Sequence, residues 1–326
     1  MDVALGVDVG GTKILGVAVS RDGDVLEELP PVPSPNSPRQ LLDSLEAAVR
    51  ALIESARLRS DEVVGIGVGV PGLIDSNGVL NETANLPAVQ GTPVRAELSR
   101  RLAPVIGDWS RTKLVIDNDG TCSAAGEWKF GAARDLSDVV VVALGTGIGG
   151  GLIAGGRLLH GGRGFAGEIG HMVIEVDGPI CVCGRRGCWE QFVSGSGHAR
   201  LAREAASKGR ATEITRLAGG DPNAIKSKHV FLAARAGDLE AWGIVDIVAK
   251  YLAVGFANLV EILDPLAIIV AGGVINDADI FIPLTREYFE QTRRGSGERA
   301  VEIRVAELGE RAGAVGAAAL GLEELS

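Results

Sequence analysis

The sequence is poor in aromatic residues and carries no block of positive charge. Its 326 residues include 7 Phe, 4 Trp and 2 Tyr, and its 42 Asp and Glu outnumber its 32 Lys and Arg, which gives a formal net charge of −10. Proteins that bind nucleic acid usually carry a basic stripe. Because no such stripe is present, we expect no nucleic-acid partner. The scarcity of aromatic rings also means that a core must be built mainly from aliphatic side chains.

A targeting leader, a long apolar run and abundant cysteine are missing as well. The first ten residues, MDVALGVDVG, begin a strand-like pattern without a basic start or a cleavage site. No uninterrupted apolar run approaches the ~18 residues that span a bilayer. We therefore expect a cytoplasmic protein with no membrane partner. Structural disulfides are rare in that compartment, so the 4 cysteines need another explanation.

The features that are present indicate a folded α/β protein. Apolar residues make up 46% of the chain, and its length exceeds the roughly 250–300 residues at which a single hydrophobic core stops growing. Strands alternate with helices, which predicts an α/β fold. A strand, a glycine turn and a second strand occur twice, around Asp8–Thr12 and around Gly145–Gly149. This repetition indicates two related lobes.

Local signals predict where the main elements begin and end. Ser37 followed by Pro38 predicts an N-cap and a first helical position, ahead of the helical-period run LLDSLEAAVRALIESA. The segments VVGIGVGVPG and KLVIDND are predicted strands, and the second leads into a helix at 121–129. Further helices are expected at 239–263, 277–291 and 312–323, with the strands PLAIIVAGG and VEIRVAEL among them.

The two glycine turns come close to known nucleotide-binding motifs without matching them. GTGIGG at 145–150 fits the dinucleotide fingerprint, but that motif needs a helix at its last glycine, and LIAGGRLL is strand-like. GVDVGGTK at 6–13 differs from a P-loop in residue order and also continues as a strand. The turns are either ordinary hairpins or turns whose N–H groups bind phosphate. Asp8 favours phosphate binding, because a carboxylate in an apolar strand is costly unless it has a partner such as Mg²⁺.

Seven motifs, in order along residues 3–321, resemble those of sugar kinases of the ROK (repressor, open reading frame, kinase) family. They are DVGGTK at 8–13, GVPG at 69–72, DND at 117–119, LGTGIGGGL at 144–152, GEIGHM at 167–172, CVCGRRGCWE at 181–190 and AGG at 271–273. The resemblance implies two actin-like (ribonuclease H-like) ATPase lobes around a central cleft. It implies a smaller lobe at 1–118 plus 312–326 and a larger lobe, with the cysteine motif, at 119–311.

The resemblance also implies a reaction, the transfer of the γ-phosphoryl group of ATP to a hexose hydroxyl with Asp119 as general base. The alternative for Asp119 is an N-cap of the following helix, and the alternative for any glutamate is simple surface exposure. The residues implied to bind the sugar are Gly72, Asn118, Asp119, Glu168, His171 and Glu190. Those implied to bind the nucleotide and its Mg²⁺ are Asp8, Gly10, Gly11, Thr12, Lys13, Gly145, Thr146, Gly147, Gly272 and Gly273.

Three of the four cysteines fall within eight residues. The set His171-x9-Cys181-x-Cys183-x4-Cys188 offers the Cys₃His ligands that structural Zn²⁺ prefers, although Cys-x-Cys is tighter than the usual spacing. A disulfide with one odd cysteine is the alternative. The family has the same motif as a structural zinc site, so the resemblance implies zinc. It also implies that His171 binds the metal through one ring nitrogen and the sugar through the other. Cys122 is expected to be a small buried hydrophobe.

The identity of the sugar rests on a few flanking segments. GEWKFGAA at 126–133 and GCWEQFVSG at 187–195 resemble bacterial ATP-dependent glucokinases, whereas ANLPAVQGTPVRAEL at 84–98 resembles N-acetylhexosamine kinases. Glucose is therefore the expected substrate and an N-acetylhexosamine the alternative, and polyphosphate stays open as a phosphoryl donor. A sugar-sensing repressor is disfavoured, because only seven residues precede Asp8 where repressors of the family carry a helix-turn-helix. A homodimer or homotetramer is expected from the resemblance.

Overall fold

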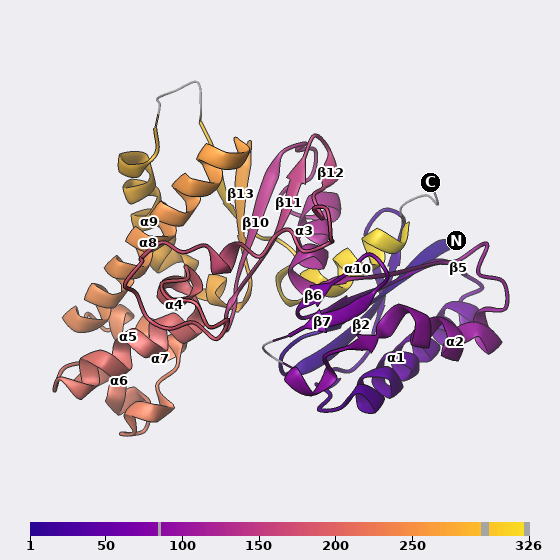
Figure 1. Ribbon diagram of the computed structural model, residues 1–326, viewed down its shortest axis with the longest axis horizontal. Coiled ribbons are helices and arrows are strands. Elements are labelled where there is room, and N and C mark those ends of the chain that lie inside the picture. The colour runs from indigo at the N-terminus through magenta and orange to yellow at the C-terminus, as the bar shows by residue number, and fades with distance from the viewer. Residues whose placement is uncertain (84–85, 295–299, 323–326) are drawn as a thin grey trace. The chain divides into compact units, whose positions relative to one another are not determined.

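The computed structural model describes residues 1–83, 86–294 and 300–322, and the chain forms two compact units (Figure 1). Unit 1 contains Met1–Val141, Gly150–Gly167 and the chain from Glu307 onwards, and unit 2 contains Val142–Gly149 and Glu168–Ala306. The predicted lobe boundary at residue 119 stays a prediction. In this grouping the segment 119–141 belongs to unit 1, because the helix that follows residue 118 packs against the last helix of the chain.

Unit 1 is built on a mixed sheet with the strand order β3-β2-β1-β5-β9, and β4 is added on β2. β1 pairs antiparallel with β2 and parallel with β5, and β5 pairs parallel with β9. β9 is therefore the edge strand beside the parallel part of the sheet. The strands are β1 (Asp2–Val9), β2 (Lys13–Ser20), β3 (Val25–Glu28), β4 (Val32–Pro33), β5 (Glu62–Val70) and β9 (Lys113–Asn118).

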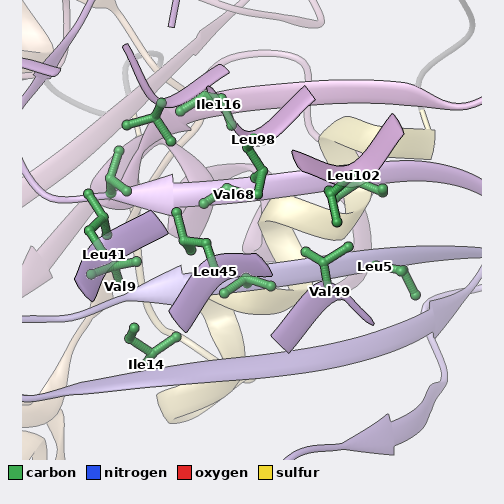
Figure 2. Packing of buried hydrophobic residues seen from close by; sticks show 14 of the residues in the cluster. Leu5, Val9, Ile14, Leu41, Leu45, Val49, Val68, Leu98, Leu102 and Ile116 are labelled. Atoms are coloured by element: carbon green, nitrogen blue, oxygen red, sulfur yellow. The ribbon is translucent and has the colours of Figure 1, made fainter. Parts of the chain in front are cut away.

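The helices α1 (Pro38–Leu58) and α2 (Val94–Ile106) cover one face of this sheet (Figure 1). Their leucines and valines interlock with inward-facing residues of β1, β5 and β9, among them Leu5, Val68 and Ile116, in an aliphatic core (Figure 2). This confirms the expectation from the low aromatic content. Ser37 caps α1 by accepting a hydrogen bond from the N–H of Gln40 at 3.3 Å, and Pro38 is its first residue, also as predicted.

The other face of the sheet is covered by α10 (Ala312–Leu322), which in turn packs against α3 (Asp119–Phe130). α10 is rich in Ala and Gly, and it lies so close to β5 that a Cβ at Gly67 would collide with the carbonyl oxygen of Ala317. Glu127 of α3 is fully buried, and it accepts the N–H groups of Ala132, Glu307 and Leu308. These hydrogen bonds fasten α3 to the segment that leads into α10. A small sheet of β6 (Leu73–Ile74), β7 (Val79–Glu82) and β8 (Thr92–Pro93), with the short helix η1 (Pro87–Val89), completes the unit.

A five-stranded sheet has the order β12-β11-β10-β13-β14. Its strands are β10 (Val139–Leu144), β11 (Ile148–Ala154), β12 (Arg157–Leu158), β13 (Ala267–Ala271) and β14 (Glu302–Val305). The turn Gly145–Gly147 leads directly into β11, so the dinucleotide-binding alternative, which required a helix at this point, is wrong. The predicted strand–turn–strand units are both present.

Most of the rest of unit 2 is helical, apart from the segment 172–189 that carries the cysteines. α8 (Leu239–Leu263) begins and ends where the sequence predicted, and Phe256 on it packs edge-on against Trp189 with ring centroids 5.9 Å apart. α8 is long and apolar enough to cross a membrane by composition, but 61% of its most apolar window is buried in the protein, as expected for a core helix. The remaining helices are η2 (Ile169–His171), α4 (Glu190–Val193), α5 (Gly195–Ser207), α6 (Thr212–Leu217), η3 (Pro222–Ala224), α7 (Ser227–Arg235), η4 (Gly273–Asp277) and α9 (Ala278–Thr292), with η5 (Gly309–Arg311) leading into α10 in unit 1.

Candidate functional site

The junction between β9 and α3 holds the predicted base and its neighbour. Asn118 is the N-cap of α3, since its Oδ1 accepts the N–H of Thr121 at 3.1 Å, and its Nδ2 donates to the carbonyl oxygen of Gly72 at 3.0 Å. Asp119 is the first helical residue, so its interpretation as the N-cap is wrong. Its Oδ1 accepts the N–H of Gly120 at 2.9 Å. Burial raises the pKa of Asp119, and this hydrogen bond opposes the rise.

Gly72 is glycine for a steric reason. Its φ is +123°, and a Cβ there would collide with the carbonyl oxygen of Glu82 and the side chain of Thr83. The left-handed backbone turns the carbonyl group of Gly72 towards Asn118. The three predicted sugar ligands of unit 1 therefore lie together. Asn118 is hydrogen-bonded to Gly72 and is followed directly by Asp119.

Asp8 lies at the same end of unit 1. Burial, together with the nearby carboxylate of Asp119, raises its pKa to about 7, against the opposing effect of Lys13. Oδ1 of Asp8 is buried and has no hydrogen-bond partner in the described part of the chain. Gly69 and Gly313 leave space around this carboxylate that a Cβ at either position would fill. Two adjacent carboxylates with an unsatisfied buried oxygen form a donor set that fits a hard divalent cation such as Mg²⁺.

The first glycine turn joins β1 to β2 beside Asp8. Gly10 donates its N–H to the carbonyl oxygen of Lys13 at 2.9 Å, and Gly11 and Thr12 are exposed at the tip. Lys13 forms an ion pair with Glu310 at 2.5 Å between Nζ and Oε2. The exposed N–H groups of this turn and the Lys13 ammonium are the kind of donors that bind phosphate oxygens.

The four predicted zinc ligands come together in unit 2. The candidate ligand atoms of His171, Cys181, Cys183 and Cys188 all lie within 4.8 Å of one another, and all three cysteines are free. Nδ1 of His171 is 3.6 Å from Sγ of Cys181, and the Sγ atoms of Cys183 and Cys188 are 3.6 Å apart. Ligand atoms of a tetrahedral zinc site lie roughly 3.5–3.8 Å apart, given the Zn–S and Zn–N bond lengths. The cluster therefore fits Zn²⁺, and the disulfide alternative is wrong.

Two predicted sugar ligands flank this cluster. Oε1 of Glu190 accepts a hydrogen bond from Sγ of Cys181 at 2.9 Å, and Glu190 is 7% exposed, so its interpretation as a surface residue is wrong. Nε2 of His171 lies 3.8 Å from Oε2 of Glu168, whose side chain is 39% exposed. Nδ1 of His171 thus faces the sulfur atoms, and Nε2 faces Glu168.

The second glycine turn lies beside Glu190. A Cβ at Gly147 would come within 2.8 Å of Oε2 of Glu190, and the carbonyl oxygen of Thr146 accepts the N–H of Ser196 at 3.2 Å. Gly272, with φ +88°, is so close to the backbone of Leu144 that a Cβ would collide with it. The ends of β10 and β13 therefore place the predicted nucleotide residues Gly145, Thr146, Gly147, Gly272 and Gly273 in one region of unit 2.

The predicted site residues thus form two groups, one in each unit. Asp8, Gly10, Gly11, Thr12, Lys13, Gly72, Asn118 and Asp119 belong to unit 1, and the other predicted residues belong to unit 2. Cys122 is buried at 0% exposure in unit 1, apart from the zinc ligands, as predicted. One close pair was not predicted: Nε2 of His160 lies 2.7 Å from Oδ2 of Asp117. In the sequence, only the place of Asp117 at the start of DND could have drawn attention to this pair.

Comparison with known proteins connects this arrangement to one family. The chain is 34% identical over 327 residues to a glucokinase of Streptomyces coelicolor, covering 99% of this chain and 98% of that protein. It is 31% identical to an N-acetylmannosamine kinase of Escherichia coli O157:H7, covering 88% of each. A crystal structure of a ROK family glucokinase from Streptomyces griseus in complex with glucose and AMPPNP matches with a TM-score of 0.82 and 33% identity, covering 98% and 99% of the two chains.

The solved glucokinase and its relatives have the two-lobe actin-like ATPase fold, which confirms the predicted fold class. The family pattern itself matches residues 4–324, nearly the whole chain. The chain belongs to the ROK family.

Proposed function

We propose that this protein is an ATP-dependent glucokinase that transfers the γ-phosphoryl group of ATP to a hydroxyl of glucose, with Asp119 as general base. The observation that carries the proposal is the β9–α3 junction, where Asn118 and Asp119 are held by Gly72 and by the first turn of α3. The similarity to glucokinases over the full chain supports the choice of reaction.

Asp119 is suited to accept the proton of the attacking hydroxyl. Its Oδ1 is held by the N–H of Gly120, which fixes the direction of the carboxylate. Burial raises its pKa, and a base with a higher pKa binds a transferred proton more strongly. Asn118 offers both an amide donor and a carbonyl acceptor for sugar hydroxyls.

The phosphates are bound by donors rather than by covalent chemistry. Gly11, Thr12 and Lys13 of the first turn and Thr146 and Gly147 of the second are the proposed phosphate-binding residues, and Gly272 and Gly273 the proposed contacts to the adenosine. Asp8 is the proposed Mg²⁺ ligand, since its Oδ1 is buried without a partner. When bound there, Mg²⁺ neutralises negative charge on the phosphate oxygens.

Zn²⁺ is proposed as a structural ion held by His171, Cys181, Cys183 and Cys188. In this arrangement Nδ1 of His171 faces the cysteine cluster and binds the metal. Nε2 therefore carries the proton and donates to a sugar hydroxyl near Glu168. Glu190, packed against Cys181, accepts from a second hydroxyl. The cysteine cluster therefore orients two sugar ligands at once.

One second candidate is favoured by a specific observation, the 31% identity to an N-acetylmannosamine kinase. The segment 84–98 also pointed to N-acetylhexosamines, but residues 84 and 85 lie outside the described part of the chain. We further propose a cytoplasmic homodimer or homotetramer. No nucleic-acid partner is proposed, in keeping with the net charge of −10.

The deciding experiment is a substrate panel on the purified protein. ADP release is measured with ATP and Mg²⁺ on glucose, mannose, fructose, N-acetylglucosamine and N-acetylmannosamine, and glucose is tested again with polyphosphate in place of ATP. The proposal expects the highest kcat/KM for glucose with ATP. A higher kcat/KM for an N-acetyl sugar supports the second candidate, and faster transfer from polyphosphate contradicts the proposed donor.

A further inference from the structure

Unit 1 contains a cavity of about 440 Å³ that none of the proposed sugar or nucleotide residues lines. It lies along the edge strand β9, between the turn at Ile74–Ser76 and the loop at 160–164. Packing between these two loops is tight, because a Cβ at Gly164 would come within 2.8 Å of the carbonyl oxygen of Ile74. The volume is that of a site for a small molecule, since ligand pockets commonly measure roughly 300–1,000 Å³.

Three cationic side chains line this cavity, beside aliphatic residues of β9 and two carboxylates. Arg95, Lys113 and Arg163 all contribute to its wall, and none of them forms an ion pair in the part of the chain that the structure describes. Nη1 of Arg95 donates to the carbonyl oxygen of Ser76 at 2.7 Å, whereas Nε of Arg95 is buried without a hydrogen-bond partner among the described residues. The protein has a net charge of −10, so a cavity lined by three cationic side chains stands apart from its overall charge and favours an anionic ligand.

The two carboxylates in the wall are already satisfied. Asp117 is 8% exposed; its Oδ2 lies 2.7 Å from Nε2 of His160, and its Oδ1 accepts the N–H of Asn118 at 2.8 Å. Oδ1 of Asp75 accepts the N–H groups of Asn77 and Val79 at 2.9 and 3.1 Å. Among the charged side chains of the wall, the donors of Arg95, Lys113 and Arg163 are therefore the groups left to bind a ligand.

We propose that this cavity binds a phosphomonoester dianion, through Lys113 and Arg163 with Arg95 at its rim. Guanidinium and ammonium groups bind phosphate through charge-assisted hydrogen bonds, and arginine does so in a bidentate manner. The volume accommodates a small phosphorylated molecule, either a sugar phosphate or free orthophosphate. A sugar phosphate is the chemical class of the product of the proposed reaction, so the site would sense product apart from the catalytic residues.

β9 gives the site a physical connection to catalysis. Lys113 and Asp117 lie in the cavity wall, and the next two residues of the chain are Asn118 and Asp119. An anion that draws Arg163 inwards also acts on the loop that carries His160, and His160 is the partner of Asp117. A ligand bound in the cavity can therefore affect the position of Asp119 through β9 and the His160–Asp117 pair.

The test is direct binding to the full-length protein, measured by calorimetry with orthophosphate and with glucose 6-phosphate. Glucose and AMPPNP are present at saturating concentration, so that the proposed catalytic site is filled. The double variant Lys113→Gln/Arg163→Gln is compared with Arg157→Gln, which removes an exposed cation on the neighbouring β12 that does not line the cavity. The single variant Arg163→Gln changes only an exposed loop residue and serves if the double variant folds poorly.

The proposal expects one saturable site in the wild-type protein, weakened about tenfold or more in the double variant, because two donors of charge-assisted hydrogen bonds are removed. Arg157→Gln is expected to bind like the wild type. Tighter binding of glucose 6-phosphate identifies a sugar phosphate as the occupant, and equal binding identifies the phosphate group alone. No saturable binding at millimolar concentration, or equal binding by the wild-type protein and the cavity variants, overturns the proposal. These outcomes do not depend on which sugar the enzyme phosphorylates.

Discussion

Nδ1 of His171 lies 3.6 Å from Sγ of Cys181, while Nε2 of the same ring lies 3.8 Å from Oε2 of Glu168. One imidazole thus connects the cysteine cluster to a proposed sugar ligand. A metal on Nδ1 fixes both the ring plane and the tautomer. Loss of a zinc ligand should therefore weaken sugar binding as well as metal binding.

Cys183→Ala is expected to lose the zinc and most of the activity together. The remaining three ligands no longer close a tetrahedral site, so His171 and Glu190 lose their fixed positions. Zinc content by mass spectrometry and the KM for glucose are measured on the same preparation. Cys122→Ala, which removes a buried cysteine outside the cluster, should retain one zinc per chain. A zinc-free Cys183→Ala protein with normal KM and kcat would refute the structural role.

Asp8 predicts a dependence of Mg²⁺ binding on pH. Its pKa is raised to about 7, so the carboxylate is largely protonated below that pH, and a protonated carboxyl binds Mg²⁺ poorly. The apparent affinity for Mg²⁺ should therefore rise as the pH rises towards 7 and level off above it. Titrations between pH 5.5 and 8.5 measure this. Asp8→Asn should bind Mg²⁺ weakly at every pH, and a pH-independent affinity in the wild type contradicts the assignment.

The same carboxyl affects stability in the opposite direction. Its folded pKa lies above the unfolded value of 3.8, so the folded protein holds a proton that the unfolded chain releases between about pH 4 and pH 7. In the absence of metal, the contribution of Asp8 to the free energy of unfolding falls as the pH rises through this window, by at most about 1.4 kcal/mol per pH unit. Urea denaturation of the wild type and Asp8→Asn should show a difference with this slope. Parallel curves for the two proteins would contradict the raised pKa.

The close contact between β5 and α10 predicts a large difference between two Gly→Ala substitutions. Gly67→Ala places a methyl group into the backbone at Ala317 and should destabilise unit 1 by several kcal/mol, about 3 or more for a clash that the backbone must relieve. Gly243→Ala, on the exposed side of α8 where a Cβ meets nothing, should be neutral or stabilise by up to about 1 kcal/mol. The midpoints of thermal unfolding compare them, and similar values would show that β5 and α10 are not in close contact.

Local patterns predicted most of the elements and the metal cluster. Ser37–Pro38, the two glycine turns and the cysteine spacing act over a few residues, and each was found where the sequence placed it. The N-cap of α3 was ambiguous, because Asn118 and Asp119 are adjacent and both residue types cap helices well; the hydrogen bond from Thr121 to Asn118 decides it.

The relationships that sequence reasoning missed are long-range. His160 and Asp117 are 43 residues apart, and Glu127 accepts N–H groups about 180 residues away in the chain. Such pairs follow only once the topology is known, because each residue alone is an ordinary polar side chain. The cationic cavity arises in the same way, from three residues that belong to α2, β9 and a loop.

The role of Asp119 as general base is best tested by the kcat for glucose phosphorylation in Asp119→Asn beside the wild type. Asparagine keeps the size of the side chain but cannot accept the proton, so we expect a loss of about 10²–10⁴ in kcat with thermal stability retained. Asp24→Asn, at an exposed turn, is the matched control and should keep full activity. Near-normal turnover by a folded Asp119→Asn protein would show that Asp119 is not the general base.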